Sequence, residues 1–123
     1  MAPAFERTPS ASGPLVQGFA GRGFRIDGQV YEGVLLTPER ALAWDAPPLE
    51  SLTPASVQAA LAADPEFLLL GTGSAQAFPP RAFVDALDAR GIGVDSMDSR
   101  AAARAWGLLR GEGRWIAAAL MPL

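Results

Sequence analysis

Residues 66–80 read Glu-Phe-Leu-Leu-Leu-Gly-Thr-Gly-Ser-Ala-Gln-Ala-Phe-Pro-Pro, and they contain the clearest strand signal of the chain. The apolar run at 67–70 ends abruptly in a loop that contains two glycines. A short strand that is apolar on both faces is typical of a sheet covered on each side by helices. In α/β domains the loop after such a strand is the usual place of a binding site. The stretch therefore predicts a buried central strand with a candidate site at its C-terminal end.

Helical and extended patterns alternate around this strand. A helix is expected after the cap residue Thr53, because Val57, Ala60 and Leu61 share one helical face. The elements expected after the central strand are a helix at 80–90, a strand at 92–94, a helix at 98–109 and a strand at 114–120. Right-handed crossovers then place strand 67–70 beside strand 92–94 as a parallel neighbour.

The first third of the chain predicts an antiparallel meander. Its expected strands are 24–27, 30–36 and 41–44, with a hairpin turn at Asp27-Gly28 and a bulge at Gly33. The complete pattern predicts an α/β fold: a three-layer single domain at 23–123, with a mixed central β-sheet, helices on its faces and the antiparallel N-terminal meander. Residues 1–22, rich in proline and glycine, are expected to form a flexible N-terminal arm.

Composition narrows the possible chemistry. The chain has 123 residues and a formal net charge of −3, and it contains no cysteine, histidine or lysine. The usual general base, thiolate nucleophile and Schiff-base amine are therefore missing, so we expect no catalytic residue, no metal site and no cofactor. A mildly acidic chain does not favour nucleic-acid binding. No apolar stretch is long enough for an integral membrane segment, and no secretory signal is visible, so a cytoplasmic location is expected.

Five short motifs of the second half carry a family resemblance. They are Leu69-Leu70-Gly71-Thr72-Gly73, Phe78-Pro79-Pro80, Gly91-Ile92-Gly93-Val94, Met97-Asp98-Ser99-Arg100-Ala101-Ala102 and Glu112-Gly113-Arg114. In this order and spacing they resemble the family of small uncharacterised α/β domains that includes mitochondrial complex I assembly factor 3 and the adipogenesis-associated domain protein. The resemblance covers roughly residues 23–123.

The resemblance implies a three-layer fold around a mixed sheet and no assigned activity. One mitochondrial branch of that family helps to assemble the respiratory NADH:ubiquinone oxidoreductase at the inner membrane. The chain departs from the family pattern at Ser99, where threonine is usual, and at Gly107, where asparagine often follows the aromatic residue. The second departure removes a polar side chain.

Two groups of polar residues are candidate binding sites. Gly71, Thr72, Gly73 and Ser74 could cradle an anion through their backbone N–H groups, or the glycines could simply shape the loop. Asp95, Asp98 and Ser99 lie around the expected start of the third helix. They could hold a hard cation or act as acid and base, or they could cap the helix.

The aromatic residue Phe78 is the third candidate. It either forms an exposed apolar lip that grips a partner protein or folds back into the core. The leading hypothesis is a non-catalytic binding or assembly module with a protein partner. The family resemblance implies that this partner is a subunit or assembly factor of a membrane respiratory complex, which would place the protein peripherally at the inner membrane. The alternative is a small-molecule-binding domain or carboxylate-based enzyme that uses the pocket of the 71–74 loop.

Overall fold

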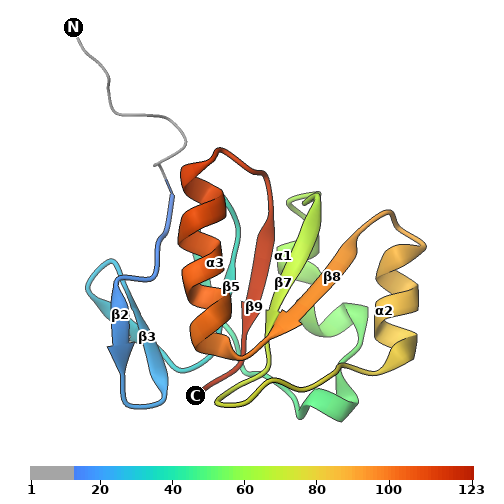
Figure 1. Ribbon diagram of the computed structural model, residues 1–123, viewed down its shortest axis with the longest axis horizontal. Helices are drawn as coiled ribbons and strands as arrows, with labels where there is room; N and C mark the ends of the chain where they lie inside the picture. The colour runs from blue at the N-terminus through green and yellow to red at the C-terminus, as the bar shows by residue number, and fades with distance from the viewer. Residues whose placement is uncertain (1–12) are drawn as a thin grey trace, which may run out of the picture.

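A mixed five-stranded sheet lies at the centre of the protein in the computed structural model, which describes residues 13–123 (Figure 1). From one edge to the other, its strands are β6 (Ala41–Ala43), β5 (Val34–Leu36), β9 (Ala117–Leu120), β7 (Phe67–Gly71) and β8 (Gly93–Met97). Strand β7 pairs in parallel with both β8 and β9, whereas β5 pairs antiparallel with β9 and β6. The predicted parallel pairing of strand 67–70 with strand 92–94 is thereby confirmed.

The leucines of β7 contribute to both faces of this sheet. Leu68 and Leu70 are buried in one hydrophobic cluster, whereas Leu69 is buried in the cluster on the opposite face. This alternation follows from the twofold side-chain period of a strand. The uninterrupted apolar run at 67–70 is therefore what a doubly covered strand requires.

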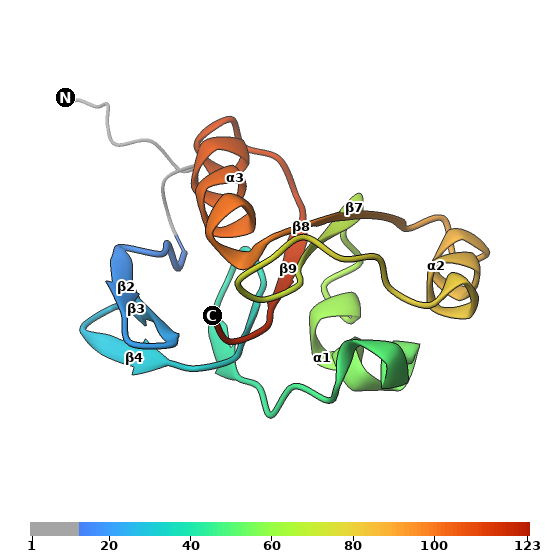
Figure 2. The ribbon, with the colours of Figure 1, turned by 60° about the horizontal axis from the view of Figure 1, so that its bottom comes forward.

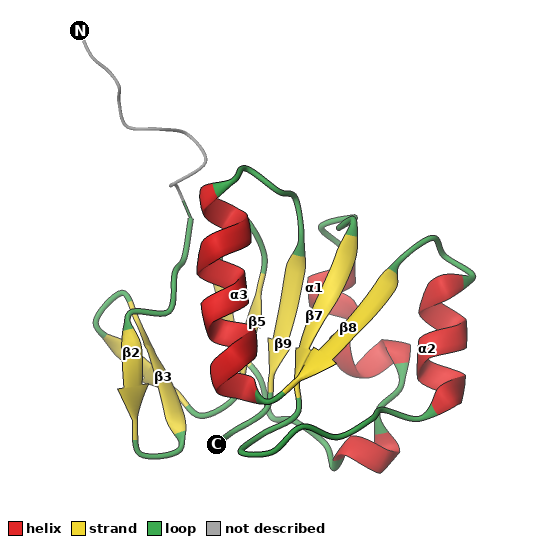
Figure 3. Ribbon diagram, viewed as in Figure 1, coloured by secondary structure: helices red, strands yellow, loops and turns green. Residues whose placement is uncertain are grey.

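Helices cover the two faces and complete the three layers (Figures 2 and 3). Helix α3 (Ser99–Gly111) covers one face, and the side chain of its Trp106 is fully buried in the hydrophobic cluster on that face. On the other face lie α1 (Gln58–Leu61) and α2 (Arg81–Asp88), and α2 buries Phe83 and Leu87. Two 3-10 helices, η2 (Leu49–Ser51) and η3 (Pro54–Val57), precede α1. No helix within residues 13–123 has the length and apolarity needed to cross a membrane.

A smaller antiparallel sheet packs beside α3 at the place of the expected N-terminal meander, but the expected third strand, 41–44, is β6 of the large sheet, and residues 18–20 supply the third strand of the small sheet instead. Its strands are β2 (Gly18–Ala20), β3 (Gly23–Ile26) and β4 (Gln29–Tyr31). Phe24 and Ile26 are fully buried and belong to the same hydrophobic cluster as Trp106 and Leu69. The two sheets thus share one core on the α3 side.

The prediction of one strand at 30–36 was wrong, because the chain bends at Gly33. Residues on either side of the bend belong to different sheets, β4 to the small one and β5 to the large one. The backbone of Gly33 approaches Trp44, whose N–H donates to the Gly33 carbonyl at 2.9 Å, and a Cβ at Gly33 would collide with the Trp44 carbonyl oxygen. This glycine therefore permits a close crossing of two segments rather than a bulge.

The segment expected to be an arm contributes a strand where it is described. Residues 1–12 lie outside the described residues, and Gly18–Ala20 forms β2, which pairs with β3. The indole N–H of Trp106 donates to the Pro14 carbonyl at 2.9 Å. Residues 14–20 are therefore tied to α3 and to the smaller sheet.

Candidate functional site

Ser99 is the centre of a buried hydrogen-bond cluster at the C-terminal end of β7. Its hydroxyl donates to the Met121 carbonyl at 2.8 Å and accepts from the Gly73 N–H at 2.8 Å. The Ser99 N–H donates in turn to the Gly73 carbonyl at 2.7 Å. One side chain thus joins the start of α3, the loop after β7 and the end of β9. Because Ser99 is fully buried, its hydroxyl is a structural group.

The two glycines of this loop allow that close packing. A Cβ at Gly71 would lie 2.7 Å from Ser99 Oγ and 2.9 Å from Ser99 Cα, which is too close for real atoms. Gly73 has φ near +100°, a conformation that favours glycine. Both residues are buried.

The loop directs its first N–H groups inward. The Thr72 N–H donates to the Met97 carbonyl at 2.9 Å, and the Gly73 N–H is bound to Ser99. The Thr72 hydroxyl lies 2.7 Å from the Ala75 carbonyl and accepts from the Ala77 N–H at 3.1 Å. These donors are already satisfied, so they are not available to an anion. Ser74 is exposed on the outer side of the same loop.

The acidic residues around the start of α3 separate into two environments. Asp98 is the N-cap of α3, and its Oδ1 accepts from the Ala101 N–H at 2.9 Å. This contact satisfies one of the donors that a helix start leaves unpaired. Asp95 is exposed on β8 and lines a surface groove instead. Within residues 13–123, no three potential metal-ligating side chains gather at one place.

Residues of α2 and β8 line a surface groove, which we call the α2–β8 groove. It has a volume of about 630 Å³ and is lined by Phe78, Pro79, Arg81, Val84, Asp85, Val94, Asp95 and Ser96. The loop that leaves β7 supplies Phe78 and Pro79, so the central strand does lead to a concave surface. The Phe78 side chain is 81% exposed, which places it at the lip of the groove and outside the core.

The charged side chains of the groove lack partners of their own. In the part of the chain that the structure describes, the side chains of Arg81, Asp85 and Asp95 make no ion pair or hydrogen bond. Phe78 and Asp95 were predicted from the sequence as site residues, whereas Arg81 and Asp85 were not. One signal was available in the sequence. The expected strand 92–94 directly follows the expected helix at 80–90, which carries both charged residues.

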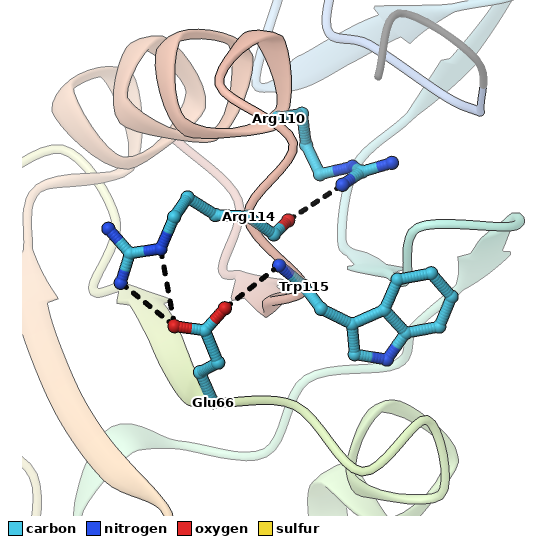
Figure 4. Close-up of polar contacts among 4 residues, drawn as sticks. All are labelled: Glu66, Arg110, Arg114 and Trp115. Carbon is cyan, nitrogen blue, oxygen red and sulfur yellow. Dashed lines mark hydrogen bonds and ion pairs between the residues drawn. The ribbon is translucent and has the colours of Figure 1, made fainter. Parts of the chain in front are cut away.

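A second polar cluster lies at the N-terminal ends of β7 and β9, away from Ser99 (Figure 4). Arg114 donates through Nη2 and Nε to Glu66 Oε1 at 2.9 and 3.2 Å, and the Trp115 N–H donates to Glu66 Oε2 at 3.2 Å. The hydrogen bond from Arg114 lowers the pKa of the Glu66 carboxyl below its usual range, with a further lowering from the Trp115 N–H. Arg110 donates to the Arg114 carbonyl at 2.6 Å. This cluster joins the start of β7 to the approach to β9.

The sequence of nearly the whole described chain matches one protein family. Residues 16–121 match DUF498/DUF598, a family described as being of unknown function. This chain belongs to the DUF498/DUF598 family. A curated relative of this DUF498/DUF598 protein is an uncharacterized protein of Rhodobacter capsulatus, which is 35% identical over 119 residues, 95% of this chain and 92% of the relative.

Solved structures agree with the fold of the DUF498/DUF598 protein. The crystal structure of a Bordetella parapertussis protein has a TM-score of 0.83 at 31% identity, over 91% of this chain and 98% of that one. The solution structure of a Bordetella pertussis protein, described as a Mth938-like domain, has a TM-score of 0.79 at 25% identity, over 99% and 92% of the two chains. These similarities confirm the expected membership of a small uncharacterised α/β family. None of these relatives is described as a respiratory assembly factor.

Proposed function

We propose that this protein is a non-catalytic binding module that holds a partner protein at the α2–β8 groove. The observation that carries the proposal is the exposure of Phe78, whose side chain is 81% accessible at the lip of a concave surface. An aromatic side chain beside a groove is a favourable anchor, because it contributes a large apolar area to a contact. The chain also lacks the histidine, cysteine and lysine side chains on which most catalytic sites depend.

The proposed partner is a subunit or assembly factor of a membrane respiratory complex. The support is the resemblance of motifs such as Leu69-Leu70-Gly71-Thr72-Gly73 to the family that contains mitochondrial complex I assembly factor 3. In this proposal the protein is cytoplasmic and associates peripherally with the inner membrane through its partner. Its formal charge of −3 favours a protein partner over a nucleic acid.

A capture experiment tests this proposal. The protein and its Phe78→Asp variant are used as baits on cytosol and detergent-solubilised membranes of the source cells, and bound proteins are identified by mass spectrometry. The matched control is Leu108→Asp, because Leu108 is 69% exposed on α3, across the sheet from the groove. We expect Phe78→Asp to lose partners that Leu108→Asp retains. Identical partners for all three baits would remove the groove from consideration.

The second candidate function is the binding of a small molecule in the same groove. Its support is the volume of about 630 Å³, which lies within the range of small-molecule pockets. The carboxylates of Asp85 and Asp95 would supply the polar contacts. Thermal-shift measurements with nucleotides, sugar phosphates and divalent cations test it, since a ligand at about 100 times its Kd stabilises a protein by about 2.7 kcal/mol. The binding-module proposal predicts no shift with any of these compounds.

A further inference from the structure

Strand β8 is an edge of the five-stranded sheet. It pairs with β7 on one side, and no strand among residues 13–123 pairs with its other side. An unpaired strand edge presents backbone N–H and C=O groups, and it can accept an additional strand from another chain.

The hydrogen bonds of β7 show which groups β8 leaves unpaired. The Met97 carbonyl accepts from the Thr72 N–H at 2.9 Å, so the backbone of Met97 faces β7. The direction of backbone groups alternates along a strand, so Asp95 also faces β7, whereas Val94 and Ser96 face away from it. The N–H and C=O groups of these two residues are therefore available at the free edge.

The α2–β8 groove lies along this free edge. Val94 and Ser96 form one wall, and Val84 and Asp85 of α2 form the other. The apolar side chains of Phe78 and Val84 can accept apolar side chains of an added segment.

The charges of the groove indicate the rest of the segment's chemistry. Asp85 of α2 and Asp95 of β8 both line the groove, Asp95 on the face of the sheet opposite to Val94, and neither has an ion-pair partner within the described residues. Arg81 is the only basic residue among those that line the groove. The balance is one negative charge, which favours basic side chains in the occupant.

We propose that the groove binds an extended segment of the partner protein, which adds as a strand to β8 and carries apolar residues together with lysine or arginine. This inference rests on the proposed function and specifies the mode of recognition. The backbone of Val94 and Ser96 supplies the hydrogen bonds, Phe78 and Val84 contact the apolar side chains, and Asp85 and Asp95 pair with the basic ones.

The first test identifies the segment with a displayed library of random linear peptides, selected on the full chain. We expect the enriched peptides to contain apolar and basic residues, and their capture to require Phe78. The best peptide is then synthesised in versions that each carry one N-methylated backbone amide. Strand addition predicts that methylation at every second position weakens binding about tenfold or more, with smaller effects at the positions between. A uniform or irregular effect along the peptide would overturn the inference.

The second test changes the protein. Ser96→Pro removes the outward N–H, whereas Ser96→Ala keeps it, and this N–H takes no part in the pairing with β7. We expect Ser96→Pro to weaken peptide binding about tenfold more than Ser96→Ala does. Asp85→Arg should weaken binding of the basic peptide, with recovery when the basic residues of the peptide are replaced by glutamate. Equal binding by all these variants would contradict the inference.

The outcomes separate the inference from the function on which it rests. If the library yields no peptide but Phe78→Asp still loses cellular partners, the binding function stands and strand addition is rejected. If Phe78→Asp and Leu108→Asp retain the same partners, the proposed function fails and the inference fails with it.

Discussion

At the scale of single residues, buried hydroxyls and exposed ion pairs stabilise this protein in different ways. Ser99 is fully buried and satisfies both the Gly73 N–H and the Met121 carbonyl. Glu66 and Arg114 are largely exposed, with 48% and 42% of their side-chain surface accessible. When a buried hydrogen-bond partner is removed, the remaining polar groups cannot bond to water, whereas groups at an exposed ion pair can.

We therefore expect Ser99→Ala to lower the free energy of unfolding by about 1–3 kcal/mol, because it leaves the Gly73 N–H and the Met121 carbonyl unsatisfied. Urea unfolding followed by tryptophan fluorescence measures the change. The matched control is Ser96→Ala, since the Ser96 side chain makes no hydrogen bond within the described residues and should change stability by less than about 0.5 kcal/mol. Equal effects of the two substitutions would contradict the role assigned to Ser99.

The Glu66 carboxyl gives a prediction about pH. Its pKa is lowered in the folded protein by the hydrogen bond from Arg114, whereas in the unfolded chain it has the ordinary glutamate value of about 4.3. The stabilisation is therefore present above pH 4.3 and is lost as the pH falls through the lower folded pKa. Glu66→Gln should be less stable than the wild type at pH 7, and the difference should shrink between about pH 4.3 and lower values. Equal stability of Glu66→Gln and the wild type at pH 7 would contradict this prediction.

At the scale of elements, β7 is the strand on which the others depend. It lies between β9 and β8, and Leu69 is fully buried on the α3 face. Leu69→Ala should cost about 2–5 kcal/mol of stability, because the truncated side chain leaves a cavity. Equilibrium denaturation measures this loss, and the exposed position Leu108→Ala on α3 is the control. A change near zero at Leu69 would show that β7 is not central.

The N-cap of α3 gives a smaller effect on its own element. Asp98→Ala removes the acceptor of the Ala101 N–H and should cost about 1 kcal/mol. Asp98→Asn retains an acceptor and should recover most of that loss, since asparagine is also a good N-cap residue. Thermal unfolding of the two variants measures the difference. Asp98→Ala with greater stability than the wild type would instead indicate strain that serves a binding site.

Local signals explain which elements were predictable. The apolar run at 67–70, the cap residue Asp98 and the left-handed glycine Gly91 after α2 act over a few residues, so the sequence pattern contains them. The break at Gly33 was missed because it depends on the approach of Trp44, 11 positions away along the chain. Arg81 and Asp85 were missed for a similar reason, since only the folded chain places them beside Asp95.

At the scale of the whole molecule, the small and large sheets share a core. Phe24 of β3 and Trp106 of α3 belong to the same hydrophobic cluster as Leu69 of β7. The second cluster, on the other face of the large sheet, includes Leu68 and Phe83. Because β7 contributes to both clusters, we expect the two sides of the protein to unfold together.

Phe24→Ala tests this coupling. It should lower stability by about 3–5 kcal/mol, and the loss should appear equally in probes of both sides of the large sheet. Suitable probes are the fluorescence of single-tryptophan variants that retain either Trp106 or Trp44, since Trp106 lies in the first cluster and Trp44 packs against the second. Separate transitions for the two probes would show that the two sides of the large sheet unfold independently.

The position of β9 also affects how the protein is made. Ribosomes synthesise β9 after both of its neighbours, β5 and β7, yet it pairs between them. Until β9 emerges, the nascent polypeptide has two apolar strands that cannot meet, and each has an edge open to aggregation. Productive folding therefore waits for translation to reach residues 117–120, and a stalled or prematurely terminated product that lacks them would be a substrate for chaperones or proteases.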